Sequence, residues 1–193
     1  MIREHLGTTS LILASGSPRR QALLKGLDVD FTIRVPNVDE TFPDSLQREA
    51  IPRHLCTLKS DACLEWLAPN MLVITADTVV WLNDQVLNKP VDRAEAKRML
   101  GQLSNQQHTV ITAVCLRSVE KSQVFHSETT VQFRALNARE IDYYLDRYQP
   151  YDKAGSYGIQ EWLGYVAIER IEGCYFNVMG LPLSQLYKEM LEF

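Results

Sequence analysis

The apolar run 11–14 is followed at once by a polar turn and a segment that favours a helix. Four apolar residues are too few for a helix but are enough for a buried strand. Gly16 permits unusual backbone angles, and Pro18 suits the first turn of a helix for which Ser17 is the cap. The sequence therefore predicts a strand, a tight loop and a helix that ends near Gly26, so that a helix N-terminus opens just after a strand end.

Two arginines, Arg19 and Arg20, stand in the first turn of this predicted helix. Backbone N–H groups and the helix dipole attract anions at a helix N-terminus, and cations are unfavourable there unless an anion arrives. For a lone arginine pair, side chains that point into water are the simplest explanation. Here the serines and the glycine of the same turn favour a site for phosphate or carboxylate. The glycine spacing of a P-loop or a dinucleotide fingerprint is missing, so neither motif is predicted.

Composition predicts one globular domain over residues 1–193, because 46% of the residues are hydrophobic and 23% are charged. The net charge of −4 leaves room for a local basic pocket but argues against a broad nucleic-acid surface. The four cysteines form no CxxC pair and have no Cys/His metal spacing, which favours reduced thiols and argues against zinc. No signal-peptide core and no apolar run of roughly 18 residues is present, so we expect a soluble cytoplasmic protein without a membrane partner.

The order of the predicted elements favours an α/β fold with a mixed twisted sheet. Further strands are predicted at 31–35, 71–76, 108–116, 123–133 and 166–171, and further helices at 52–67, 93–103, 138–149 and 183–191. Asp92 caps one of these helices, and Asn137 with Glu140 forms a capping box for the next. Residues 83–85 are typical of a hairpin turn. The two long alternating segments around residues 118–121 indicate that part of the sheet is antiparallel.

Charged side chains recur where an α/β fold places its chemistry. Asp77 follows the predicted strand 71–76 at its carboxyl end. Lys59 lies on or beside the buried stripe of helix 52–67, so its ammonium group must reach water or meet a buried anion. Both signs of charge together suit a triphosphate, which carries about four negative charges, and a divalent cation held by carboxylates. The residues in this set are Arg19, Arg20, Lys59, Lys89, Lys153, Glu40, Asp77 and Asp152.

Eight short motifs follow one another over nearly the whole chain. They are Ser15-Gly-Ser-Pro-Arg-Arg20, Val38-Asp-Glu40, Lys59, Ala76-Asp-Thr-Val-Val80, Lys89-Pro90, His108-Thr-Val-Ile-Thr112, Asp152-Lys-Ala-Gly-Ser-Tyr-Gly-Ile-Gln160 and Asn177-Val-Met-Gly-Leu-Pro182. In this order they resemble the motifs of the Maf family of nucleoside triphosphate pyrophosphatases. The resemblance implies an elongated two-lobed fold similar to that of inosine triphosphate pyrophosphatases, with the active cleft between the lobes. It also implies hydrolysis of a nucleoside triphosphate to the monophosphate and pyrophosphate with a divalent metal, Mg2+ or Mn2+.

The resemblance also implies roles for single residues. Asp77 matches the proton acceptor, and Glu40 is the expected second carboxylate beside the metal. The positions that set the choice of substrate match Arg19, Thr78 and Gln160. The residues expected to contact phosphate are Ser15, Arg19, Arg20, Lys59, Lys89 and Lys153. The chain departs from the family pattern around Lys59, where Cys56-Thr-Leu-Lys59-Ser replaces Ala-x-x-Lys-Ala, and at Glu161, where a glycine is usual. We expect the second departure to alter the loop that closes over the base, because Glu adopts a positive φ less readily than Gly.

The loop 152–160 resembles the branch of the family that acts on dTTP and UTP, whereas the 7-methyl-GTP branch replaces its Asp-Lys pair and its ending. Arg19 favours the same branch, because the methylguanosine branch typically has a large aromatic residue there. The amide of Gln160 can accept the N3–H of uracil or thymine and donate to a ring carbonyl. The expected function is therefore hydrolysis of dTTP and UTP, which would clear non-canonical or excess nucleotides.

Three alternatives stay open: a 7-methyl-GTP pyrophosphatase, a non-catalytic nucleotide-binding regulator of cell division, and a nucleic-acid-binding protein. Asp77 and Glu40 weigh against the regulator, because a binder of anions gains nothing from nearby carboxylates. The net charge of −4 weighs against the third. His108 is a tempting base, but its place at the start of an alternating strand predicts a structural hydrogen bond. Family members are often dimers, so the resemblance allows a homodimer.

Overall fold

The computed structural model describes residues 2–193, which form eight helices, two short 3-10 turns and one mixed seven-stranded sheet. The strands are β1 (Ser10–Leu13), β2 (Phe31–Ile33), β3 (Met71–Leu82), β4 (Gln85–Leu87), β5 (Gln107–Arg117), β6 (Ser122–Phe133) and β7 (Ile168–Glu172). The helices are α1 (Ile2–Leu6), α2 (Pro18–Lys25), α3 (Ala50–Asp61), α4 (Arg93–Leu103), α5 (Ala138–Tyr148), α6 (Trp162–Ala167), α7 (Tyr175–Val178) and α8 (Leu183–Glu192). The 3-10 turns are η1 (Leu64–Trp66) and η2 (Ala154–Ser156).

The sheet contains both parallel and antiparallel pairs, as the sequence predicts. Its strand order is β2-β1-β3-β5-β6-β7, with β4 paired to β3. β1 is parallel to β2 and to β3, so that Leu11 lies opposite Phe31 on one side and Leu72 on the other. β3 pairs with β4, and β6 with β7, in antiparallel fashion. Strands with parallel neighbours on both sides are usually buried on both faces, which explains why residues 11–13 are at most 2% exposed.

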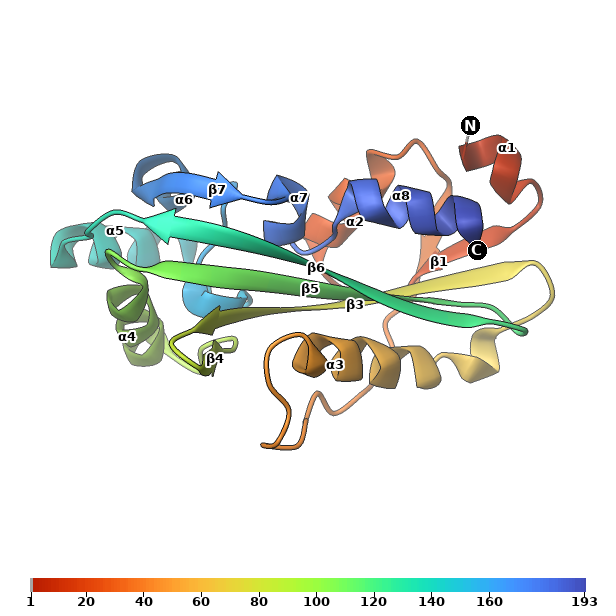
Figure 1. Ribbon diagram of the computed structural model, residues 1–193, viewed down its shortest axis with the longest axis horizontal. Helices are drawn as coiled ribbons and strands as arrows, with labels where there is room; N and C mark the ends of the chain where they lie inside the picture. Colours follow the sequence, from red (N-terminus) through yellow and green to blue (C-terminus); the bar gives the residue numbers. More distant parts are fainter. Residues whose placement is uncertain (1) are drawn as a thin grey trace. The chain divides into compact units, whose positions relative to one another are not determined.

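The chain divides into two compact units that are interleaved along the sequence. The first unit comprises the chain up to Asp77 together with Thr112–Ser127 and Gly180–Phe193, and the second comprises Thr78–Ile111 and Glu128–Met179. The long strands β3, β5 and β6, drawn in yellow and green in Figure 1, each continue from one unit into the other. A single domain over 1–193, and a cleft between two lobes, stay predictions.

In the first unit, helices cover both faces of the strands. Figure 1 shows α3 along one face and α8 along the other. The hydroxyl of Thr75 in β3 donates to the backbone carbonyl of Cys56 in α3 at 2.6 Å, and Cys56 packs with buried Cys115 of β5. On the side of α8, the amide of Gln123 donates to a carboxylate oxygen of Glu189. A hydrogen bond and apolar packing therefore hold α3 to the strands, and a side-chain hydrogen bond links α8 to them.

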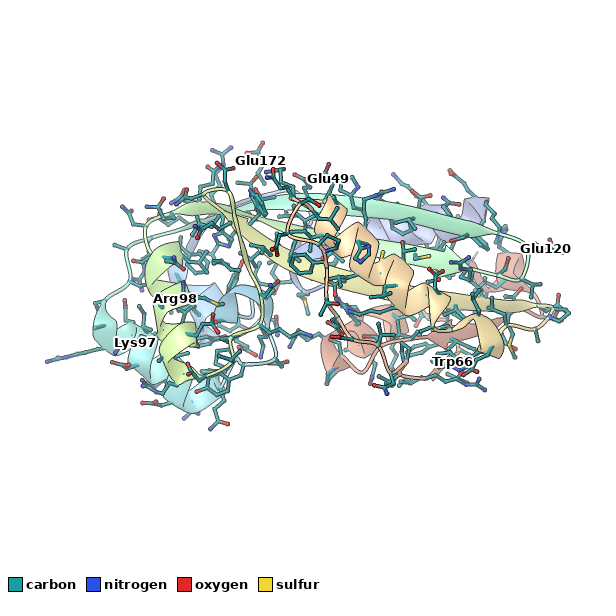
Figure 2. The ribbon with its side chains drawn as sticks, turned by 90° about the horizontal axis from the view of Figure 1, so that it is seen from below. Glu49, Trp66, Lys97, Arg98, Glu120 and Glu172 are labelled. Atoms are coloured by element: carbon teal, nitrogen blue, oxygen red, sulfur yellow. The ribbon has the colours of Figure 1, made fainter. Side chains whose placement is uncertain are left out.

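Helix α3 differs from the expected helix 52–67. It begins two residues earlier, after Glu49, which is labelled in Figure 2, and it ends at Asp61. Beyond it the backbone tightens: the N–H of Cys63 donates to the carbonyl of Ser60 at 3.0 Å, and η1 is a separate turn. The expected helix was too long, because a 3-10 turn continues the spacing of apolar residues for a few positions after the α-helical hydrogen bonds have ended.

In the second unit, α4 and α5 lie against each other over a buried aromatic and aliphatic core (Figure 1). Their exposed sides are linked by ion pairs: Arg93 lies 2.8 Å from Asp146, and Lys97, labelled in Figure 2, lies 2.8 Å from Asp142. Both predicted helix starts are confirmed. Asp92 accepts from the N–H of Glu95 at 2.8 Å, and the capping box before α5 is complete.

Several short elements differ from the expectation, whereas one predicted turn is confirmed. β7 begins at Ile168, because the preceding residues form α6, and the sequence pattern also missed α1 and α7. The predicted hairpin turn is confirmed, since Asn83 and Asp84 have φ of 47° and 59°, the left-handed values that a tight hairpin needs.

Among residues 2–193, no helix has the length and apolar character needed to cross a membrane.

Candidate functional site

A lysine lies between two carboxylates in the first unit. The ammonium group of Lys59 donates to Oδ1 of Asp77 at 2.6 Å and lies 3.1 Å from Oε1 of Glu40. Lys59 is 8% exposed and Asp77 is 7% exposed, whereas the side chain of Glu40 is 42% exposed. Of the two outcomes that the sequence leaves open for Lys59, water or a buried anion, the structure shows the second. The structure brings together three of the predicted site residues around a single nitrogen atom.

The position of Asp77 corrects one expectation. Asp77 does not follow the end of a strand: β3 runs on to Leu82, because Val79–Leu82 are buried and pair with β4. Asp77 is thus a charged side chain within an otherwise apolar strand. A buried carboxylate is tolerated only when it is paired, and Lys59 supplies the opposite charge from α3. Lys59 reaches it because it lies on the buried stripe of α3, one turn after Leu55.

The two carboxylates fit a divalent cation that is completed by a substrate. Glu40 and Asp77 offer hard oxygen ligands and both lie within 3.1 Å of the Lys59 nitrogen. Across residues 2–193, no group of three or more His, Cys, Asp or Glu side chains could hold a metal by itself. Mg2+ is commonly bound by one or two carboxylates and the phosphates of a substrate. Carboxylate oxygens without a histidine or cysteine among them are a donor set that suits Mg2+ or Mn2+.

Arg20 ties the start of α2 to two other parts of the first unit. Its Nε donates to the carbonyl of Gly180, and its Nη1 donates to the carbonyl of Ala76, both at 2.8 Å. Burial lowers the pKa of the guanidinium from its ordinary value, and the charge of Asp77 opposes that shift. Since Ala76 immediately precedes Asp77, Arg20 fixes the backbone on which the buried carboxylate stands.

The polar turn before α2 has the predicted form. Ser17 occupies the N-cap position and Pro18 the first turn, although the Ser17 side chain makes no capping hydrogen bond. Instead, the N–H of Ser17 donates to the hydroxyl of Ser15 at 3.3 Å. Arg19, in the first turn of α2, is half-buried. Phosphate binding by this turn stays a prediction.

The loop 152–161 of the second unit carries the next predicted residues. Lys153 is 8% exposed; it donates to Asp152 at 2.7 Å and lies 3.1 Å from Glu161. The loop needs glycine at position 155, where φ is +67° and a Cβ would come within 2.9 Å of the side chain of Val80. Lys153 is therefore engaged by carboxylates of its own loop. Its contact with phosphate stays a prediction.

Gln160, at the end of this loop, has a buried side-chain oxygen. Its Oε1 is buried and accepts no hydrogen bond from any of residues 2–193. Of the other predicted residues in this unit, Thr78 is half-buried in β3 and Lys89 is exposed after β4. A buried acceptor without a donor is costly, so it marks a place where a ligand can supply one.

Sequence reasoning missed Tyr144 as a residue of this region, and it expected Glu161 to alter the loop through the cost of a positive φ. In the structure Glu161 has φ of −101°, so its backbone is not in the left-handed region. The hydroxyl of Tyr144, on α5, donates to the carboxylate of Glu161. Because position 161 directly follows Gln160, the sequence could have indicated that Glu161 lies near the predicted base-binding residue. No short-range pattern connects either residue with Tyr144.

The structural role predicted for His108 is confirmed. Its Nε2 is hydrogen-bonded to the hydroxyl of Tyr157 at 2.7 Å, and its ring packs edge to face against Tyr157 and Phe133. The residue is 2% exposed, and burial lowers the pKa of the imidazole to about 3. His108 is therefore neutral at physiological pH and belongs to the core.

We expect His108 to make the protein less stable as the pH falls from 7 to 5. Its pKa is about 3 when folded and about 6.5 when unfolded, so the unfolded chain takes up the proton first, and stability present above pH 6.5 is lost toward pH 3. The loss between pH 7 and pH 5 amounts to about 2 kcal/mol. His108→Gln keeps a partner for Tyr157 and does not titrate, so urea unfolding should show a smaller loss for the variant by that amount. Equal losses in both proteins would contradict a buried neutral His108.

The chain is similar to known proteins along almost its whole length. The family model described as Maf-like protein matches residues 10–193. The chain is 49% identical to a dTTP/UTP pyrophosphatase of Parabacteroides distasonis, over 98% of this chain and 99% of that protein. It is 49% identical to one of Bacteroides fragilis, over 96% and 97%, and 47% identical to one of Flavobacterium psychrophilum, over 99% and 98%. Because the family model extends from residue 10 to the last residue and these relatives match along almost their full length, the chain belongs to the Maf-like protein family.

Proposed function

We propose that this protein hydrolyses dTTP and UTP to the nucleoside monophosphate and pyrophosphate. Family membership supports the proposal, as do relatives that carry the name dTTP/UTP pyrophosphatase and are 47% to 49% identical over at least 96% of the chain. The structural observation that carries it is the buried ammonium group of Lys59 between the carboxylates of Asp77 and Glu40. This arrangement offers a base, a cation and a second carboxylate at one place.

Asp77 is the base in this proposal. It accepts a proton from the water that attacks the α-phosphorus, while the bond from that phosphorus to the bridging oxygen breaks and pyrophosphate leaves in line. Lys59 holds the Asp77 oxygen in place through the 2.6 Å hydrogen bond, and Arg20 fixes the preceding backbone through Ala76. Glu40 and Asp77 would hold the divalent cation, which supplies positive charge against the phosphate oxygens when it is bound.

The basic residues balance the charge of the triphosphate. The ammonium group of Lys59 and the neighbouring guanidinium of Arg20 only balance the two carboxylates, so they leave no net positive charge for a polyphosphate. Cations are therefore needed in addition to Lys59 and Arg20. We assign this role to Arg19 and Lys89, with Ser15 as a hydrogen-bond donor from the polar turn.

Gln160 is the residue that reads the base. Its buried Oε1 lacks a donor among residues 2–193, and the N3–H of uracil or thymine is a donor of the right kind. The amide nitrogen then donates to a ring carbonyl, and the hydroxyl of Thr78 extends the contact. Cytosine presents an acceptor at N3, so it would leave the Gln160 oxygen unsatisfied.

A panel of canonical and modified nucleoside triphosphates tests this function. We expect dTTP and UTP to yield the monophosphate and pyrophosphate, identified by chromatography, and 7-methyl-GTP and the purine triphosphates to be poor substrates. Gln160→Ala should reduce the preference for UTP over CTP by about 10-fold, because one buried hydrogen bond is lost. Gln85→Ala, the same change at an exposed position, is the matched control. Faster turnover of 7-methyl-GTP would contradict the base assignment, and nucleotide binding without pyrophosphate release would favour the regulator.

A further inference from the structure

The carboxylate of Glu161 joins three segments of the second unit. Its Oε2 accepts a hydrogen bond from the hydroxyl of Tyr144 on α5, and its Oε1 lies 3.1 Å from Nζ of Lys153 at the start of the loop 152–161. The backbone N–H of Gly158, in the middle of the loop, donates to the same tyrosine hydroxyl at 3.0 Å. We infer that Glu161 is a positioning residue that fixes the Gln160 amide and so sets the selectivity for the base, an inference that rests on the proposed function.

The hydroxyl of Tyr144 is used in both directions. Because the Gly158 N–H occupies its acceptor side, its single proton is directed to Glu161. Tyr144 is 0% exposed, and burial together with the hydrogen bond to Glu161 raises the pKa of the phenol, so the proton is retained. The partner at position 161 must therefore be an acceptor.

Lys153 places a second requirement on position 161. Its ammonium group has donors only, so the atom of residue 161 that faces it must also be an acceptor. A carboxylate satisfies both neighbours with its two oxygens. A glutamine accepts from Tyr144 with its one oxygen and then turns its NH2 group toward the ammonium of Lys153. The pair of partners is thus specific for an acid.

Gly158 couples Glu161 to Gln160. A Cβ at position 158 would come within 2.9 Å of Cδ of Glu161 and 3.0 Å of Nε2 of Gln160, so both side chains fold against the same glycine. The N–H of Glu161 also donates to the carbonyl of Gly158 at 3.0 Å, which closes the turn. Any shift of the Glu161 carboxylate therefore displaces the surface against which the Gln160 amide rests.

Orientation of this amide decides which pyrimidine is accepted. The buried Oε1 of Gln160 selects for a ring donor, but an amide free to rotate by half a turn presents its nitrogen and suits the N3 acceptor of cytosine. The contacts of Glu161 with Tyr144 and Lys153 oppose that rotation by holding the turn rigid. In this inference the charge of Lys153, which also donates to Asp152 at 2.7 Å, stabilises the loop 152–161.

The test compares Glu161→Gln and Tyr144→Phe with the unaltered protein. Each change removes one side of the Glu161 contact and leaves Gln160 in place. We expect the ratio of kcat/KM for UTP over CTP to fall by about 10-fold in each variant, with the loss for UTP mainly in KM. Glu169→Gln, the same change at an exposed position on β7, is the matched control and should keep the ratio. Thermal unfolding identifies a variant that does not fold, in which case the other variant gives the answer.

A binding measurement separates this proposal from the proposed function. Titration with UTP and CTP analogues that carry an imido bridge between the α- and β-phosphorus measures selectivity without turnover. A folded variant that keeps the preference of the unaltered protein for the UTP analogue overturns the role of Glu161, whether or not UTP is hydrolysed. Lack of pyrophosphate release from UTP by the unaltered protein, with a binding preference that the variants lose, rejects the proposed function and supports the role of Glu161.

Discussion

Asp77→Asn should reduce the turnover of dTTP and UTP by at least about 100-fold while it leaves the fold intact. Asparagine has nearly the same shape and can still accept the hydrogen bond from Lys59, but its side chain cannot take up the proton of the attacking water. The effect should therefore fall on kcat more than on nucleotide binding. Single-turnover release of pyrophosphate, measured beside binding of an imido-bridged UTP analogue, separates the two quantities.

Two controls make this result specific. Asp44→Asn is the same change at an exposed position of the first unit and should leave turnover unchanged. Thermal unfolding of Asp77→Asn should show a folded protein, since removal of a charge from a buried pair is costly but the isosteric amide keeps the hydrogen bond. Near-normal kcat in folded Asp77→Asn would exclude Asp77 as the base.

Removal of divalent cations should abolish hydrolysis, and Mg2+ or Mn2+ should restore it. The argument is one of charge: Lys59 and Arg20 only balance the carboxylates of Asp77 and Glu40, so a triphosphate with about four negative charges needs a further cation to approach Asp77 closely. Pyrophosphate release in excess EDTA, followed by titration with each metal, measures the effect.

Glu40→Gln provides the matching variant for the metal experiment. Because one of the two carboxylates is lost, we expect the variant to need roughly 10-fold more Mg2+ for half-maximal activity. Full activity of the unaltered protein in excess EDTA would mean that the basic residues suffice, and Glu40 would then serve only to hold Lys59.

Local structure was predicted well from the sequence because its causes lie within a few residues. The strand, turn and helix at the N-terminal end follow from an apolar run, Gly16 and Pro18. The caps of α4 and α5 follow from Asp92 and from Asn137 with Glu140, and the left-handed turn at Asn83 follows from a residue type that tolerates positive φ. The mixed sheet follows from the order of such elements.

The same local reasoning failed at two elements, the end of one helix and the end of one strand. The expected helix 52–67 ends at Asp61, because apolar spacing alone does not distinguish an α-helix from a following 3-10 turn. Asp77 was expected at the carboxyl end of a strand 71–76, because the apolar run stops there. β3 nevertheless continues, because Lys59 neutralises that charge from another element and β4 pairs with the rest of the strand.

The residues of the candidate site were identified in the sequence one by one, but their partners were decided only by the tertiary structure. The sequence left open whether Lys59 reaches water or meets an anion, and the fold places Asp77 and Glu40 beside it. The phosphate contact expected of Arg20 stays a prediction, but its hydrogen bond to the carbonyl of Gly180, 160 residues away along the chain, is seen only in the fold. Caps and turns depend on the dihedral angles and hydrogen bonds of neighbouring residues, and the types of those residues largely determine both. Contacts between distant residues depend on how a whole core packs and on the entropy of closing long loops, which no single stretch of sequence contains.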